Sequence, residues 1–244
     1  MGTSASYDAP PSWAGLKNEV TRAAHQGTLA GHKIRHIVQR VIHENGGKNA
    51  IARGGREAPN GAAGSAAPAR DVAARLGNFI SDVRSFGLNE AAQRLGLGDL
   101  SDKPVGEVLL AVLDRVGGPA STIDEADARQ ALSDLQDELL AEAQTVEEVE
   151  SILIEAGQNL ENLLERFFGH YIFEQFSRIF YERLVQRVGA TEAASFIGQI
   201  KEFIVSSLAN RAATKDLSKV DWAGKEGASI VSDICAQTLE VFGA

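Results

Sequence analysis

The stretch 159–188 constrains the fold most strongly, because it holds seven of the fifteen aromatic residues of the protein. Leu160 and Leu164 begin an apolar series at helical spacing, and Phe176 and Phe180 belong to a second series on another face of the same helix. A helix that is apolar on more than one side must be buried on more than one side. We therefore expect the central helix of a bundle.

Two further features refine this prediction. Charged residues from Glu161 to Arg183 interrupt the apolar run too often for a membrane span. Gly169 lies inside the predicted helix and indicates either a close backbone approach or a kink. The aromatic side chains could line a ligand pocket, but a packed core is the preferred interpretation.

The rest of the chain is typical of helices with clear start signals. Thr122 with Glu125 and Thr145 with Glu148 match the capping-box pattern, in which each side chain binds a free amide of the helix start. Few segments show the alternation or the β-branched density of strands. The predicted fold class is all-α, a helical bundle around 159–188.

Composition divides the chain into four parts. Residues 1–12 are small and polar and are predicted to be a flexible tail. Residues 13–56 have helical periodicity and are predicted to form a flexible basic helical arm. Residues 57–70 are predicted to be a linker from their Gly, Ala and Pro content. The remainder, 71–244, is predicted to be a single acidic all-helical domain.

Charge is unevenly distributed along the chain. The formal net charge is −9, yet 13–56 carries eight Lys and Arg against two Glu. A basic arm beside an acidic domain is expected to fold onto an acidic partner or onto its own body, or to bind nucleic acid. The candidate contact residues of this arm are Arg22, Lys33, Arg35, Arg40, Arg53 and Arg56.

No enzyme signature is visible in the sequence. It contains no GxSxG nucleophile elbow, and the glycine runs GGKNA and ARGGRE lack the ending of a phosphate-binding loop. His32 and His36 have a spacing that can chelate a metal ion, but Gly27 and Gly31 argue against one rigid helix there, so partner contact or solvent exposure is preferred. We expect a non-enzymatic protein with no catalytic residue, no metal and no bound cofactor.

Two single residues, His170 and Cys235, are candidates for a chemical role, and the cysteine also bears on the compartment. His170 lies in the predicted central helix and is interpreted as a satisfied core residue. Cys235 is the only cysteine and has no basic neighbour in sequence that would favour a thiolate. A single cysteine, no spanning apolar run and no signal-peptide pattern lead us to expect a cytoplasmic protein without membrane contact.

Several segments together resemble the QatB-like family of bacterial Qat anti-phage defence proteins. The resemblance includes the opening MGTSASY, the Pro-Pro-Ser-Trp segment, the basic glycine-containing stretch and the acidic body. The matching segments of the body are 79–84, 118–126, 171–174, 180–184, 221–224 and 238–243. None of them is a catalytic signature, so the resemblance indicates a family rather than an activity.

The resemblance implies partners. It implies an operon that also encodes an ATPase, a QueC-like enzyme and a TatD-like nuclease. QueC enzymes use ATP to activate a 7-carboxy-7-deazaguanine and pass it to ammonia. A protein without a visible active site beside such an enzyme is interpreted as its protein substrate or scaffold. The alternative is a nucleic-acid-binding subunit that uses the basic arm; a steep salt dependence of DNA or RNA binding would distinguish it.

The substrate hypothesis points to the first residues. Removal of Met1 exposes the α-amine of Gly2, whose pKa near ~7.7–8.0 leaves a nucleophilic fraction at neutral pH. Gly2 is the predicted site of conjugation to a 7-deazaguanine, which the partner supplies. Recognition by the partner is assigned to Thr3, Ser4, Ser6, Tyr7 and Trp13, with Trp13 as an aromatic anchor. The alternative is an ordinary disordered tail.

Overall fold

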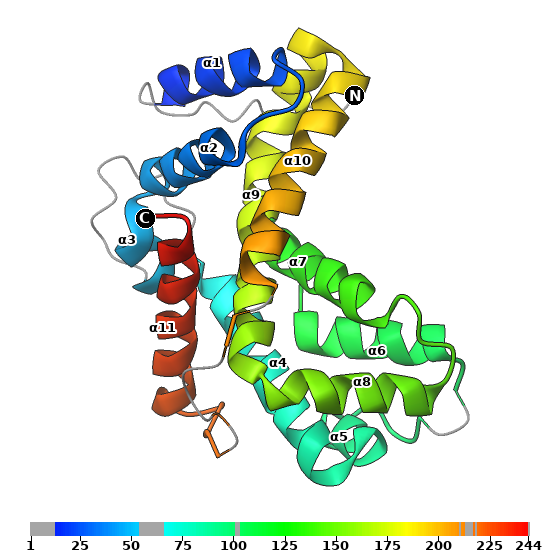
Figure 1. Ribbon diagram of the computed structural model, residues 1–244. Coiled ribbons are helices and arrows are strands. Elements are labelled where there is room, and N and C mark those ends of the chain that lie inside the picture. The colour runs from blue at the N-terminus through cyan, green and yellow to red at the C-terminus, as the bar shows by residue number, and fades with distance from the viewer. Residues whose placement is uncertain are drawn as a thin grey trace.

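The computed structural model describes residues 13–53, 66–100, 103–209, 211–212, 217 and 219–243. These residues form eleven α-helices and no strand, so the predicted all-α class is confirmed (Figure 1). The helices are α1 (Trp13–Ala24), α2 (Gly31–Glu44), α3 (Gly47–Arg53), α4 (Ala67–Phe86), α5 (Leu88–Arg94), α6 (Val105–Gly117), α7 (Ile123–Leu140), α8 (Val146–Gln158), α9 (Leu160–Val188), α10 (Ala190–Leu208) and α11 (Lys225–Val241).

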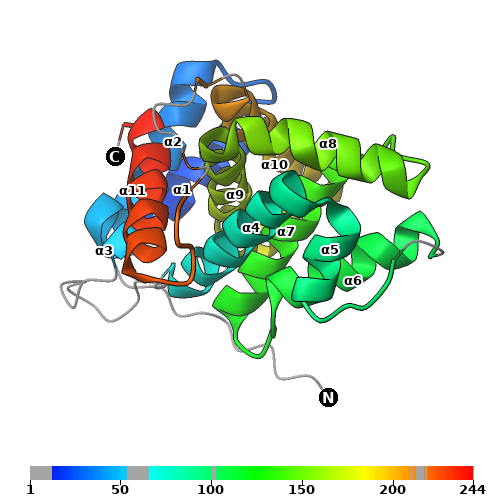
Figure 2. The same cartoon turned by 90° about the horizontal axis from the view of Figure 1, so that it is seen from below.

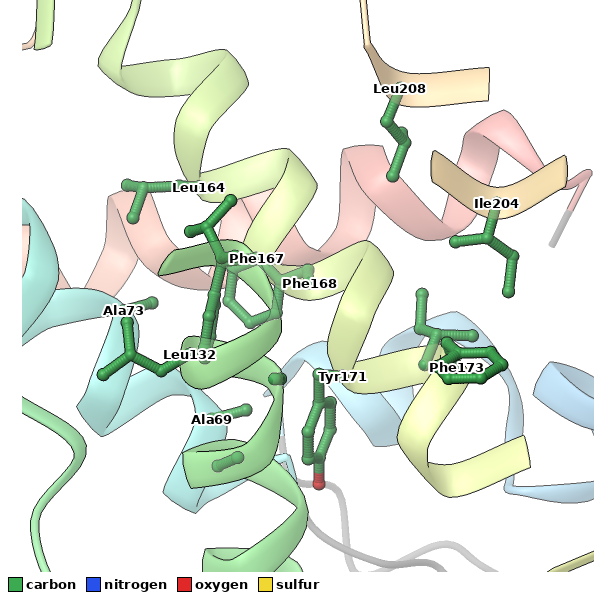
Figure 3. Close-up of a cluster of buried hydrophobic side chains, with 14 of the residues drawn as sticks. Ala69, Ala73, Leu132, Leu164, Phe167, Phe168, Tyr171, Phe173, Ile204 and Leu208 are labelled. Carbon is green, nitrogen blue, oxygen red and sulfur yellow. The ribbon is translucent and has the colours of Figure 1, made fainter. Parts of the chain in front are cut away.

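Helix α9 is the centre of the fold, as its two apolar faces predict. Helix α10 runs beside it, while α1 and α11 cover one side and α4 and α7 another (Figures 1 and 2). In Figure 3, Phe167 and Phe168 point towards Ala73 of α4 and Leu132 of α7. Both phenylalanine side chains are buried. The aromatic residues of α9 therefore fill a packed core, and the preferred interpretation is confirmed.

Gly169 marks a close approach between helices rather than a kink. A Cβ atom at this position would lie 2.5 Å from Cδ1 of Leu208 and 3.3 Å from Cγ2 of Ile204, both on α10. Figure 3 shows these two side chains facing α9. Glycine lets α10 approach α9 closely at this position, since any larger residue would displace the two side chains.

Both predicted capping boxes are present. Thr122 Oγ1 accepts a hydrogen bond from the Glu125 amide at 3.2 Å, and the Glu125 carboxylate accepts one from the Thr122 amide at 2.8 Å. Thr145 and Glu148 repeat the arrangement at the start of α8. The paired carboxylates at these positions therefore serve the helix starts, as their place in the sequence predicts.

The basic arm differs from the prediction in its packing. Leu16 and Val20 of α1 and Val41 and Ile42 of α2 are buried in the same apolar cluster as α9. The turn between α1 and α2 is held on α10 through Gln199, whose amide oxygen accepts the Leu29 backbone N–H at 2.9 Å and whose amide N–H donates to the Gly27 carbonyl at 3.2 Å. In the described part, 13–53 is a packed layer on the body and not a flexible arm.

Two helices begin at positions that the predicted domain boundaries do not indicate. Helix α4 begins at Ala67, inside the predicted linker, with Pro68 in its first turn. Proline fits this position because its missing amide has no partner at a helix start, and alanine is a strong helix former. Helix α3 begins directly after α2, because Gly46 and Gly47 take positive φ angles of 97° and 77° and turn the chain.

The turn before α11 is fixed by Trp222. Its side chain is buried, and its indole N–H donates a hydrogen bond to Ser81 Oγ at 3.0 Å. A Cβ atom on Gly77 of α4 would lie 2.7 Å from the indole ring. These contacts fix the start of α11 against α4. From there α11 runs along one side of α9.

The first prediction concerns the core. We expect Phe176→Ala to lower the free energy of unfolding by about 3–5 kcal/mol, because the side chain is 1% exposed and leaves a cavity. Tyr181→Ala on the same helix is the control, because Tyr181 is 44% exposed. Urea denaturation followed by far-UV circular dichroism measures both. Equal midpoints for the two variants would show that α9 is not the packed centre.

The second prediction concerns a glycine that neither periodicity nor capping singles out. A Cβ atom on Gly227 would lie 2.6 Å from the Trp222 Cα and 2.7 Å from its carbonyl oxygen, and backbone atoms cannot step aside. We expect Gly227→Ala to destabilise the protein. The control Gly198→Ala, in open space on α10, is expected to stabilise by about 0.5–1 kcal/mol. Thermal melts of both variants test this. A Gly227→Ala variant with the melting temperature of the parent would contradict the close packing of Gly227 against Trp222.

Candidate partner-binding surface

Trp13 lies in the core of the protein and not on its surface. Its side chain is 2% exposed, and its ring centroid lies 6.4 Å from that of Phe180 on α9. This burial corrects the expectation that Trp13 is an anchor for a partner, because the indole already fills the space between α1 and α9. Its position instead fixes the start of α1 on the body.

Arg40 and Arg35 are engaged within the chain. The Arg40 guanidinium forms an ion pair with Glu19 of α1 and lies 3.9 Å from Glu44 of its own helix. Arg35 donates a hydrogen bond to the Val241 carbonyl at the end of α11, at 2.8 Å. A cation at a helix C-terminus is favourable because it faces the carbonyls that have no partner in the helix.

Helix α3 faces α11 through opposite charges. Lys48 Nζ lies 2.7 Å from Glu240, and the Arg53 guanidinium lies 3.5 Å from Asp233. Of the expectations for the basic arm, folding onto its own acidic body is the one that these contacts favour. Gly2, Thr3, Ser4, Ser6, Tyr7 and Arg56 lie outside the described residues, so their assigned roles stay predictions.

A cleft between α1 and α2 brings together two cations of the layer, Arg22 and Lys33, with Glu19 also in its lining. It has a volume of about 330 Å³ and is lined by Arg22 of α1 and by His32, Lys33 and His36 of α2, among others. Lys33 Nζ donates to Gln26 at 3.1 Å across the cleft. The cleft therefore presents positive charge on the same layer that begins at Trp13, and it is the candidate surface for an acidic partner.

A larger groove lies between α4 and α11. Its volume is about 980 Å³, and Arg70 and Arg75 of α4 lie along it. Arg70 donates to the Ile51 carbonyl at 2.9 Å, and Arg75 donates to the Val116 and Gly117 carbonyls at 2.6 and 3.1 Å. Both arginines therefore bind the C-terminal carbonyls of neighbouring helices, a structural role that sequence spacing does not reveal.

The histidine of the central helix belongs to a buried polar network. His170 is 2% exposed, its Nε2 lies 2.7 Å from Glu138, and its Nδ1 lies 3.8 Å from Asp134 without a hydrogen-bond partner among the described residues. Asp134 also accepts from Lys201 of α10 at 2.6 Å. The network joins α7, α9 and α10. The interpretation of His170 as a core residue is confirmed, although only one ring nitrogen is hydrogen-bonded.

Two titratable groups have strongly shifted pKa values. Burial raises the pKa of the Cys235 thiol to about 12, which agrees with the interpretation that Cys235 is not a thiolate nucleophile. Burial also raises the pKa of Glu174 on α9 to about 7, and the nearby Asp134 carboxylate adds to the shift. The folded protein therefore prefers the protonated form of Glu174 below neutral pH.

Similarity to known proteins places this fold in a family. The family model described as Qat anti-phage system associated protein QatB matches residues 58–242. The chain belongs to the QatB family. Its members are associated with the Qat system, so this protein is a component of Qat anti-phage defence. No curated protein and no solved structure matches the chain.

The QatB match has a clear extent. It covers α4 to α11 and begins after the layer α1–α3, so it does not include the opening residues on which the resemblance also drew. Its description assigns association with a defence system and no reaction. Among the residues described here, no helix is long and apolar enough to cross a membrane.

The third prediction uses the pKa of Glu174. Because its folded-state pKa is raised, its contribution to stability is present below about pH 4.5 and is lost as the pH rises through about 7. We expect Glu174→Gln to be more stable than the parent at pH 8, by about 1 kcal/mol after solvent screening, and equal to it near pH 4.5. Urea midpoints at both pH values test this, with the exposed Glu155→Gln as control. A difference that does not change with pH would contradict it.

Proposed function

We propose that this QatB family member is the protein partner and substrate of a QueC-like enzyme, which joins a 7-deazaguanine to the α-amine of Gly2. The observation that supports this most is the burial of Trp13 at the start of α1. The start of α1 is thereby fixed on the folded body, and residues 1–12, here called the tether, are joined to this fixed base. Family membership supplies the context, because a Qat component acts together with others of its system.

The length of the tether suits this role. Gly2 precedes Trp13 by eleven residues, so the chain permits it to reach at most about 36–40 Å from the fixed base. That reach allows the terminal amine to enter a deep active site while the body stays docked outside it. Thr3, Ser4, Ser6 and Tyr7 carry side chains that pair with a groove along the way.

The chemistry requires a free amine and an activated acid. The α-amine has a pKa near ~7.7–8.0 against ~10.4 for lysine, so it is the more nucleophilic amine at neutral pH. Its nitrogen forms an amide bond with the carboxyl carbon of the 7-carboxy-7-deazaguanine. The activating group derived from ATP leaves, and the nitrogen gives up its surplus proton to solvent. This chain supplies no cofactor, since the partner provides the activated base.

Docking is assigned to the cleft between α1 and α2. Arg22 and Lys33 line it, and an acidic surface on the partner complements both. Arg35 and Arg40, which the alternative of nucleic-acid binding also needs, are engaged with the Val241 carbonyl and with Glu19. This engagement favours a protein partner over a nucleic acid. The ATPase and the TatD-like nuclease are further partners that the Qat context implies.

Mass spectrometry tests the conjugation. After co-expression with the QueC-like enzyme and its nucleobase precursor, we expect a mass increase that peptide mapping places on Gly2. The control Gly2→Leu keeps Met1, because a large second residue blocks its removal, and is expected to stay unmodified. An unmodified Gly2 amine in cells that resist phage would contradict the proposal.

A second experiment tests the docking surface. We expect the double variant Arg22→Glu, Lys33→Glu to lose co-purification with the enzyme at least tenfold while its melting temperature stays near that of the parent. Lys225→Glu, which reverses an exposed cation at the start of α11, is the matched control and is expected to have no effect. Equal loss in both variants would assign the effect to net charge. Tight, steeply salt-dependent binding of DNA that the double variant loses would favour the nucleic-acid alternative.

A further inference from the structure

Helix α6 is mostly apolar and is packed on one side, while its exposed side carries Leu110 together with Glu107, Asp114 and Arg115. Val108 and Val116 are buried, whereas Leu110 is 56% exposed. The partly buried apolar residues of the same helix are Val105, Leu109, Ala111, Val112 and Leu113. Figure 1 shows α6 at the edge of the molecule, with α7 and α8 beside it. Leu110 is therefore a large apolar side chain exposed between the carboxylates of Glu107 and Asp114, three residues before it and four after it on the same helix.

The packed side of α6 is itself incompletely filled. A hollow of about 40 Å³ lies between α4, α6, α7 and α8, and it is lined by leucine, valine, isoleucine and phenylalanine side chains with Gln136 as the one polar side chain among the described lining residues. Leu109 and Leu113 line this hollow and are partly exposed as well. The apolar surface of α6 is therefore continuous from the hollow towards Leu110.

The surroundings of α6 are strongly acidic. Residues 105–158, which span α6 to α8, contain thirteen Asp and Glu against Arg115 and Arg129, a net charge of −11. Both arginines are engaged: Arg115 donates to the Leu95 carbonyl at 2.6 Å, and Arg129 to the Gly118 carbonyl at 3.1 Å. Arg129 also pairs with Asp114, and cations of α9 and α10 pair with four further carboxylates, namely Arg178 with Asp124 and Asp127, Arg166 with Glu138 and Lys201 with Asp134. The acidic excess that is left comes from the remaining carboxylates of the lobe.

Several of these carboxylates face solvent. The exposed ones for which no ion pair is found among the described residues are Glu107, Asp137, Glu142, Glu147, Glu148 and Glu155, of which Glu148 caps the start of α8. An apolar centre with a charged border is the usual arrangement of a protein interface. The negative charge of this border favours a positively charged partner, since like charges across an interface are costly.

We propose that the exposed face of α6 binds a basic amphipathic helix of another protein, with apolar side chains on Leu110 and lysine or arginine residues against the acidic border. Gly106 and Leu110 stand one turn apart, and nothing lies within 4 Å of where a Cβ of Gly106 would be. This open position lets the partner helix approach closely. The inference does not depend on the proposed modification of Gly2.

A second copy of this chain fits the face less well. Two lobes of charge −11 repel each other in a symmetric contact. A head-to-tail contact would bring the open cations Arg22 and Lys33 of the α1–α2 cleft against this face, but the apolar residues of that layer, such as Leu16 and Ile42, are buried and cannot cover Leu110. Charge complementarity therefore favours a basic partner from another chain.

A peptide titration on the full chain tests the proposal. The probe is a fluorescent helical peptide with leucine at positions i, i+3, i+4 and i+7 and lysine elsewhere, and its matched form carries serine in place of leucine. We expect the leucine peptide to bind, its affinity to fall at least tenfold with Leu110→Ser, and binding to weaken steeply between low and high salt. Tyr181→Ser, an exposed aromatic residue at the far end of α9, is the control and is expected to leave the affinity unchanged.

Three outcomes would overturn it. Equal affinity of the leucine and serine peptides would reduce the contact to charge alone. An unchanged affinity of Leu110→Ser, with the parent melting curve retained, would place the contact elsewhere. A concentration-dependent dimer of the free protein that Leu110→Ser abolishes, measured by light scattering, would assign the face to a second copy.

Discussion

The burial of α9 on several faces is the constraint on which the rest of this structure depends. Phe180 lies beside Trp13 of α1, Phe176 lies near Phe196 of α10, and Phe167 points towards α4 and α7, so no single helix covers them. The cover comes from distant parts of the chain, with α1 from the start, α4 and α7 from the middle and α10 and α11 from the end. Large apolar side chains stabilise a fold by about 1.5–3 kcal/mol each when buried. The N-terminal layer is therefore part of the core.

The surface ion pairs of the protein contribute little to the stability of this core, and their main effect is on the charge of the surface. The ion pairs of Lys48 with Glu240 and Arg53 with Asp233 lie at the surface, where such pairs contribute about 0–1 kcal/mol. Their effect is to neutralise part of the basic layer, which leaves the cleft around Arg22 and Lys33 as its open cationic surface. The opposite charge gathers on α6 to α8. A Qat component with one basic and one acidic region is suited to contact two different partners.

The sequence predicts the parts of the fold that local rules determine. Apolar periodicity identified α9, and the Thr-x-x-Glu pattern identified the starts of α7 and α8. Gly169 indicated a close approach or a kink, and the structure was needed to show that it is the approach of α10. The docking of α1 was not predictable, because its apolar face around Leu16 shows that a partner surface exists but not which one. The linker composition before α4 also suggested separation, whereas alanine and Pro68 start a helix there. The exposure of Leu110 on α6 needed the structure, because it depends on which neighbouring helices cover α6.

The central claim, that the basic layer and the acidic body share one core, has a direct test in the two tryptophans. Trp222→Phe leaves Trp13 as the reporter of α1, and Trp13→Phe leaves Trp222 as the reporter of the start of α11. In each variant, urea unfolding is followed by fluorescence and by far-UV circular dichroism. A shared core predicts that the two transitions coincide within each variant. A Trp13 fluorescence transition at lower urea than the loss of helix would show that α1 leaves a body that remains folded, and would contradict it.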